Sequence, residues 1–474
     1  MKRSKNKLVG LLFVAILSFA LLSPFVVAAP QDDKIGVLLI GTGMPEEYDA
    51  DAYVGLKYFF NNYLLKMMMP FMGILAEKVF STVDEGTLLV DRDDPSCSVE
   101  KENPNLIDAW GRPYAGKDYK WVSEPSIIST FRVIPGFGGQ IDDIMPQFSY
   151  YLAPDGPGKS ESDIWEYMGL MMYNIYHGYD DHKDTTTERE LKIMDEAEAK
   201  LKESYGDKII VKRGFMMPYP GLPDARIVAE KLVREEGVKD LVLAESYVCY
   251  FGSSSPARWI SEYLEEEGLD VNIVESGQIG GTEPYNKGVA KKVEEELKNI
   301  PNDKNVVVIL NHHGMPYANM LFYDSRKEPY HHSAEVTFEG AKKAIYDLDI
   351  VENWKGKFDI LKAYNEMAEG MMDPDNEILS VAEAADKAVG EGYEYCINVP
   401  YGVGNIAYET LIGLREYSWG VSPPAWEIYY EDGLKKFRTT TKYDGMNVII
   451  TDGWIDGYGE GYYEQISKAI DDIL

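Results

Sequence analysis

The main prediction about the fold of this chain comes from one segment, Val306-Val307-Val308-Ile309-Leu310-Asn311-His312-His313-Gly314-Met315-Pro316. Its five apolar residues, most of them β-branched, predict a buried strand, and the polar residues that follow predict a loop. Ligands of open α/β sheets bind at the carboxyl ends of the strands. A catalytic imidazole is therefore expected in this loop, and four of the chain's six histidines lie between His312 and His332.

Short strands alternate with helical patterns on both sides of this segment. Strands are expected at Ile35–Ile40, Lys208–Val211, Asp240–Ala244, Val271–Glu275, Val306–Leu310 and Tyr395–Val399. Helices are expected at about 49–80, Thr185–Tyr205, Asp224–Glu236, Ser255–Glu267, Tyr285–Asn299, Ala334–Leu348, Ile378–Glu391 and Asn405–Tyr417. This alternation predicts an α/β protein with two Rossmann-like lobes, each a doubly wound parallel sheet, and a cleft between them.

Two pairs of similar segments point to an internal duplication. Val37–Pro45 and Val307–Pro316 are both strands that end in Gly-Met-Pro, although the second has one extra residue before that tripeptide. Asp240–Tyr247 likewise parallels Tyr393–Tyr401. Chance similarity between strands of the same class is the alternative.

The N-terminus has the pattern of an export signal. Four basic residues precede an apolar stretch, Leu8–Val27, and Val27-Ala28-Ala29 offers a small-residue cleavage site. This pattern predicts a signal peptide at 1–29 and an exported, periplasmic or extracytoplasmic protein. The apolar stretch is long enough to span a bilayer, so a retained membrane anchor stays open.

The mature chain is expected to have two lobes, an N-terminal one at 30–299 and a C-terminal one at 300–474 that carries the histidine loop. Residues 85–160 are rich in Pro, Gly and Asp and are expected to be an insertion in the first lobe.

Charge and cysteine content exclude several classes of function. Without its first 29 residues the chain has 43 Lys and Arg against 79 Asp and Glu, a net charge of −36, which excludes nucleic acid as a partner. Cys97, Cys249 and Cys396 are too few and too far apart for a disulfide framework or a cysteine metal site. Cys249 and Cys396 are expected in the core.

The histidine segment resembles a signature of a known family. Asn311–Pro316 resembles the Ser-Ala-His-Gly-Leu-Pro motif of ferrochelatases, members of the tetrapyrrole metallochelatase superfamily, and His313 falls on the family's catalytic histidine. Glu409-Thr410-Leu411 follows Pro400 at the family's spacing, so Glu409 falls on its catalytic glutamate. Weaker matches occur in the family's order between Ile35 and Tyr417, at Val37–Pro45, Gly214–Pro220, Asp240–Ser254 and Glu328–Tyr330.

The resemblance implies that a divalent metal is inserted into a tetrapyrrole such as a porphyrin or sirohydrochlorin, as in haem biosynthesis. Fe²⁺ or Co²⁺ would be a substrate, and no organic cofactor is evident. His313 would accept protons and bind the metal, with His312 as a further ligand or support, and Glu409 would be the opposing carboxylate that also contacts the metal. The ring would be contacted by Met44, Pro45, Tyr219, Ser253, Ser254 and Tyr317.

The sequence also departs from the family pattern. Ala407 replaces a histidine two residues before Glu409, and Met216 stands near the place of the family's arginine. With the export signal, these departures favour an alternative, a non-catalytic extracytoplasmic protein of the same fold that binds haem, another tetrapyrrole or metal. Another metal-dependent or periplasmic binding protein with two lobes is a third possibility. Weaker metal-site candidates are the pair His331-His332 and the acidic loop with His177 and His182.

Overall fold

The computed structural model describes residues 34–44, 185–217, 221–250, 255–313, 324–365, 378–403, 414, 419 and 426–474. The expected signal peptide at 1–29, the insertion at 85–160 and the helix expected at about 49–80 lie outside these residues, and of the helix expected at Asn405–Tyr417 only Leu414 is described. Among the described helices, none combines the length and apolar character needed to cross a bilayer.

The first lobe is a four-stranded parallel sheet in the order β2-β1-β3-β4. Its strands are β1 (Ile35–Gly41), β2 (Ile209–Phe215), β3 (Asp240–Glu245) and β4 (Asn272–Glu275). Its helices are α8 (Thr186–Tyr205), α9 (Ala225–Arg234) and α10 (Pro256–Glu266), and the turn η3 (Gly206–Lys208) follows α8. Successive β1 side chains alternate between two apolar clusters, one shared with α8 and one shared with α9 and α10, so both faces of the sheet are covered.

Local sequence explains where the helices of this lobe begin. The Asp224 carboxylate accepts the Arg226 N–H at the start of α9, and the Ser255 hydroxyl accepts the Arg258 N–H at the start of α10. Pro256 occupies the first turn of α10, where the missing N–H has no intrahelical partner to lose. These caps place both helix starts within a residue or two of the predicted ones.

The second lobe is a six-stranded sheet in the order β6-β5-β7-β10-β9-β8. Its strands are β5 (Val306–His313), β6 (Phe358–Asn365), β7 (Tyr395–Val399), β8 (Trp426–Glu431), β9 (Leu434–Tyr443) and β10 (Met446–Ile450). Its helices are α12 (Asp324–Tyr346), α13 (Asp349–Glu352) and α14 (Val381–Gly390), with the turn η6 (Tyr401–Val403) after β7. The sheet is parallel from β6 to β10, whereas β8 and β9 form an antiparallel hairpin.

The structure corrects the sequence predictions for this lobe at several points. The expected loop at Asn311–His313 is wrong, because β6 continues to pair with β5 as far as His313 and Asn365. Strands β6, β8, β9 and β10 were not predicted, since their apolar residues are interrupted by Asp, Glu, Lys, Arg or Asn. The Asp432-Gly433 turn of the β8–β9 hairpin, with φ values of 52° and 77°, uses a dipeptide that favours the left-handed conformation.

The two lobes repeat the same strand order. When β8 and β9 are set aside, β5, β6, β7 and β10 follow the order 2-1-3-4 that β1, β2, β3 and β4 also follow. Both pairs of similar segments in the sequence fall on equivalent strands, one pair on β1 and β5 and the other on β3 and β7. The prediction of two α/β lobes is therefore confirmed, with a shared topology that agrees with duplication.

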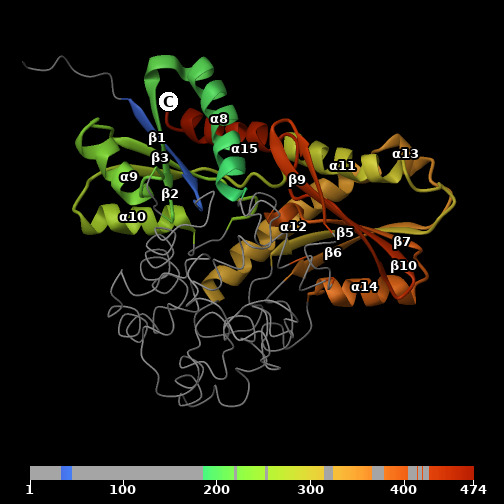
Figure 1. Ribbon diagram of the computed structural model, residues 1–474. Coiled ribbons are helices and arrows are strands. Elements are labelled where there is room, and N and C mark those ends of the chain that lie inside the picture. The colour runs from blue at the N-terminus through green and yellow to red at the C-terminus, as the bar shows by residue number, and fades with distance from the viewer. Residues whose placement is uncertain are drawn as a thin grey trace, which may run out of the picture.

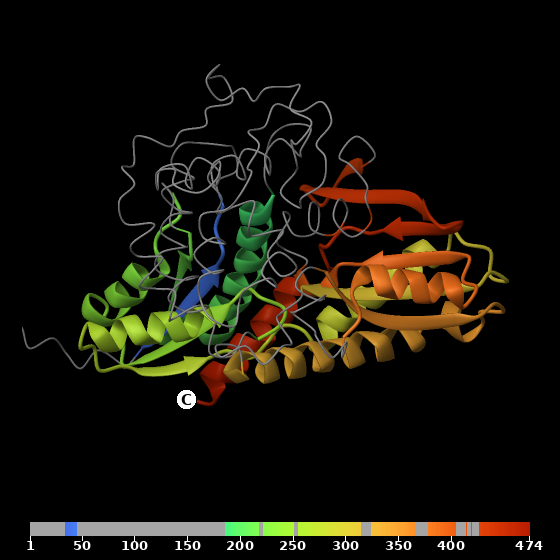
Figure 2. The ribbon, with the colours of Figure 1, turned by 90° about the horizontal axis from the view of Figure 1, so that it is seen from below.

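The last helix of each lobe packs on the other lobe. Helix α11 (Glu283–Leu297) follows β4 but lies against α12, and α15 (Tyr458–Asp471) follows β10 but lies against α8 (Figures 1 and 2). The expected boundary at 299/300 falls between α11 and β5, so α11 belongs to the first lobe in sequence and to the second in space. Where the crossing helices meet, a Cβ on Gly288 would come within 1.8 Å of the Asp456 carbonyl oxygen, so only glycine fits there.

Candidate functional site

The strand order of each sheet reverses between its first and third strands, and the carboxyl ends of these two strands, where ligands of open α/β sheets bind, are here called the crevice of the lobe. In the first lobe, the Tyr247 hydroxyl after β3 lies 2.9 Å from the Thr42 hydroxyl after β1. In the second lobe, the Tyr401 hydroxyl after β7 lies 2.5 Å from His312 Nε2 near the end of β5. A tyrosine thus joins the two strand ends of each crevice, with Thr42 at the position equivalent to His312.

The carboxyl ends of the two sheets meet at the interface between the lobes. Cys249 Sγ, in the segment after β3, lies 3.5 Å from His312 Nδ1. On α11, the Tyr285 hydroxyl donates to the Tyr401 carbonyl, and on α15 the Tyr458 hydroxyl donates to the Ser246 carbonyl at 2.8 Å. The rings of Tyr285 and Tyr458 also meet edge to face, with centroids 5.3 Å apart, so the exchanged helices hold both crevices at one interface.

His312 is fully buried within this interface. Burial, followed by the positive charges of Lys362 and His331, lowers the pKa of His312 to about 3, so its imidazole is neutral at ordinary pH. Burial also raises the pKa of Tyr401 well above 10 and that of Cys249 to about 12. A Cβ on Gly402 would come within 2.4 Å of His312 Nδ1, so the chain after β7 requires glycine there.

The surroundings of His312 bear on its predicted role as a metal ligand. A metal bound at Nε2 of His312 would have to replace the Tyr401 hydroxyl, and one bound at Nδ1 would have to replace Cys249 Sγ. The role of His312 as a metal ligand stays a prediction. The expectation that Cys249 and Cys396 lie in the core is confirmed, because both thiols are buried.

His313 is the last residue of β5 and is half-buried. Side chains alternate along a strand, so His313 shares a face of the sheet with Asn311, and His312 lies on the other face. The Tyr330 hydroxyl on α12 donates to the His313 carbonyl at 2.6 Å, and His313 is paired in register with Asn365 of β6. The backbone of the predicted catalytic histidine is thus held from two sides, while its side chain keeps part of its exposure.

The other predicted site residues divide into described and undescribed ones. Met44 is buried, and its backbone N–H donates to the Thr187 hydroxyl at 2.6 Å. His331 is buried and His332 is exposed, both within α12, which begins earlier than predicted. Outside the described residues lie Pro45, His177, His182, Tyr219, Ser253, Ser254, Tyr317, Ala407 and Glu409.

The loop after β1 is occupied by a carboxylate that the sequence did not single out. Glu190, on the first turns of α8, accepts the Thr42 N–H at 2.7 Å and the Gly43 N–H at 3.0 Å. Backbone N–H groups at such a loop usually bind an anionic ligand. Here a side chain of the protein fills that position, and a glutamate inside a charged helix carries no sequence signal of this role.

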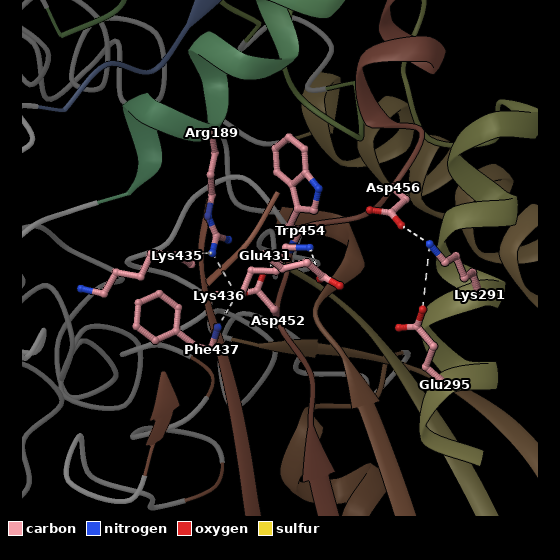
Figure 3. Close-up of polar contacts among 10 residues, drawn as sticks. All are labelled: Arg189, Lys291, Glu295, Glu431, Lys435, Lys436, Phe437, Asp452, Trp454 and Asp456. Carbon is pink, nitrogen blue, oxygen red and sulfur yellow. Dashed lines mark hydrogen bonds and ion pairs between the residues drawn. The ribbon is translucent and has the colours of Figure 1, made fainter. Parts of the chain in front are cut away.

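A buried ion pair joins α8 of the first lobe to the second lobe (Figure 3). Arg189 Nη2 donates to Asp452 Oδ2 at 2.9 Å and to the Lys435 carbonyl at 2.8 Å. Asp452, just after β10, also accepts the N–H groups of Phe437 and Trp454. Burial alone would raise the pKa of Asp452, but the charges of Arg189 and Lys292 and these hydrogen bonds hold it below its usual value.

An uncharged contact occupies the equivalent place after β4. Gln278 Nε2 donates to the Gly280 carbonyl at 2.9 Å and reaches the Ser333 carbonyl on α12 at 3.3 Å. The segment after β4 therefore contacts α12 of the second lobe, and the segment after the equivalent strand β10 contacts α8 of the first. The contact after β10 is ionic and buried, whereas the contact after β4 is neutral.

Within the described ranges, no three His, Cys, Asp or Glu side chains form a group that could hold a metal ion.

No family model and no curated protein matches this sequence. Among solved structures, SirB from Bacillus subtilis with Fe3+ is 12% identical, with a TM-score of 0.34 over 60% of this chain and 92% of that chain. An ABC transporter solute binding protein from Clostridium phytofermentas with bound L-rhamnose is 8% identical, with a TM-score of 0.19 over 58% and 94%. LsrB from Clostridium saccharobutylicum in complex with AI-2 is 11% identical, with a TM-score of 0.20 over 56% and 91%. Likenesses this distant assign no activity.

Proposed function

We propose that this protein is an exported, ferrochelatase-like metallochelatase that inserts Fe²⁺, or Co²⁺, into a tetrapyrrole. The observation that carries the proposal is the place of His313. It ends β5 at the carboxyl edge of the second sheet, it is half-buried, and it stands in a motif like that of the ferrochelatase catalytic histidine. Glu409 is the proposed opposing carboxylate, on the strength of its spacing from Pro400.

The chemistry needs groups that these residues supply. Metal insertion removes two pyrrole N–H protons, and a neutral imidazole can accept a proton near neutral pH or bind a divalent metal as it arrives. A carboxylate on the far side of the ring can relay the second proton or guide the metal. The fixed backbone of His313, bound by Tyr330 and β6, limits the positions its imidazole can take.

An anaerobic metallation assay tests this proposal. Purified mature protein is incubated with a porphyrin or sirohydrochlorin and Fe²⁺, Co²⁺ or Zn²⁺, and the absorbance change of the ring is followed. His313→Ala is expected to lower the rate at least 100-fold, the usual contribution of a general base. The control is Lys343→Ala, which removes an exposed side chain of α12 in the same lobe and should leave the rate unchanged.

Two results would contradict the proposal. One is an unchanged rate in His313→Ala, which would refute the site. The other is tight haem binding with no metallation of any ring, which would favour the extracytoplasmic binding protein that the export signal also fits. Glu409→Gln in the same assay tests the carboxylate, because the amide cannot take up a proton.

A further inference from the structure

Two buried asparagines beside His313 have amide groups that are only partly satisfied. Asn311 Nδ2 donates to Asn365 Oδ1 at 3.1 Å, and both side chains are buried, with 0% and 1% exposure. Among the described residues, Asn311 Oδ1 and Asn365 Nδ2 have no hydrogen-bond partner. Exchanging oxygen and nitrogen on both amides gives the same result, one free acceptor and one free donor side by side.

These amides share a face of the sheet with the proposed catalytic histidine. Asn311 lies two residues before His313 on β5, and Asn365 is paired in register with His313 on β6. Side chains two apart on a strand, and those paired across it, point to the same side of a sheet. The free donor and acceptor are therefore at the carboxyl edge where a ligand of His313 would be.

A third asparagine on the same face has hydrogen-bond partners for both its amide nitrogen and its amide oxygen. Asn398 of β7, which is paired with Ile309, donates to the Ile309 carbonyl at 3.1 Å and accepts the Trp419 indole N–H at 3.3 Å. A buried amide that lacks a partner destabilises the folded state by about 1–3 kcal/mol. The two unsatisfied groups next to His313 thus differ from a neighbour whose role is structural.

The charge of this face indicates which ligand group fits. In the described parts of β5, β6 and β7, no lysine or arginine shares the face, because Lys362 points to the opposite face and pairs with Glu335. A carboxylate would find no counter-charge on these strands and would meet the oxygen of Asn311. A carboxamide carries both an N–H for the free acceptor and a C=O for the free donor.

We propose that Asn311 and Asn365 bind a neutral carboxamide group of the ligand on which His313 acts. The inference deepens the proposed function and rests on it for the identity of the ligand as a tetrapyrrole. It names a substrate whose acidic side groups have been converted, at least in part, to amides. An amidating reaction would then have to precede metal insertion.

Binding without metal tests the inference. A porphyrin with two free propionates and the same porphyrin as its bis-carboxamide are titrated into the mature protein, and quenching of its tryptophan and tyrosine fluorescence is followed. We expect the bis-carboxamide to bind about tenfold more tightly, the worth of one or two hydrogen bonds. Asn365→Asp should remove this preference, since the carboxylate offers no donor.

A second pair of variants separates ligand recognition from folding. Asn311→Leu with Asn365→Leu should leave the melting temperature of the ligand-free protein unchanged or higher, while removing the preference for the amide. Asn398→Leu is the matched control and should lower the melting temperature, because it leaves Trp419 without its acceptor.

Each outcome bears on one proposal. Equal affinity for the two porphyrins, or a preference that survives the double Leu variant, would overturn the carboxamide site. A clear amide preference without metallation by any metal would leave the site standing and refute the metallochelatase. Metallation without any amide preference would support the metallochelatase and refute the carboxamide site.

Discussion

The two lobes share a strand order but differ in the groups placed at equivalent positions. The crevice of the first lobe has Thr42 bound to Tyr247, with the loop backbone held by Glu190. The crevice of the second has His312 bound to Tyr401, followed by the half-buried His313. The same scaffold thus carries a threonine and a glutamate at the strand end of one lobe and two histidines at that of the other. The strand order places these residues at equivalent strand ends, and the proposed function assigns the chemistry to the lobe whose strand end carries the histidines.

The largest difference is expected between the two contacts that join the lobes. Arg189→Met should lower the free energy of unfolding by about 3–5 kcal/mol, because it leaves Asp452 charged and buried without its partner. Gln278→Met, at the equivalent place after β4, should cost only about 0.5–1.5 kcal/mol, the worth of neutral hydrogen bonds. Urea unfolding of the two variants measures both. Equal losses would show that the ionic contact contributes no more than the neutral one.

A smaller difference is expected in the pH dependence of the two crevices. The pKa of His312 is about 3 in the folded state against an ordinary value of 6.5, so between these values the unfolded chain binds a proton that the folded one excludes. Stability from this group is complete above pH 6.5 and falls as the pH is lowered toward 3, by about 1.4 kcal/mol per pH unit. The loss from pH 7 to pH 4.5 should therefore be about 2–3 kcal/mol smaller in His312→Gln than in the natural protein.

Urea unfolding at the two pH values checks this, and Thr42→Ala is the control. Thr42 occupies the equivalent position in the first lobe and does not titrate, so its variant should keep the full pH dependence. If His312→Gln keeps it as well, His312 is not the group that is held neutral.

The smallest difference is expected between the two bridging tyrosines. Tyr401→Phe should cost about 1–2 kcal/mol, because it leaves a ring nitrogen of the fully buried His312 without its hydroxyl partner. Tyr247→Phe should cost about 0.5–1 kcal/mol, since Thr42 and Tyr247 lie nearer to solvent. Thermal unfolding followed by circular dichroism compares them, and a larger loss for Tyr247→Phe would reverse the assignment of the more buried crevice.

Much of this fold could be predicted from local sequence. Continuous β-branched runs such as Val306–Leu310 form buried parallel strands, and capping residues such as Ser255 mark the helix starts. Prediction failed for β6, β8, β9 and β10. Their residues are mixed in polarity, and their pairing energy comes from neighbouring strands distant in sequence.

The candidate site could be predicted only in part. The order of motifs singled out His313 and Glu409, and the strand before His313 placed it at a sheet edge. No motif in the sequence marks Asn311 or Asn365 as a site residue. Only strand pairing brings them together, because they lie 54 positions apart.

The sequence by itself determined the two-lobed α/β class, the repeat of strands and a histidine close after the run Val306–Leu310, since these follow from local hydrophobic pattern and motif. The tertiary structure alone decided that His312 is neutral and that Arg189 and Asp452 pair across the lobes. It also decided that each lobe gives its last helix to the other. Burial, charge pairing and the packing of each last helix on the other lobe depend on contacts between segments that are distant in sequence. The local pattern of residues does not specify those contacts.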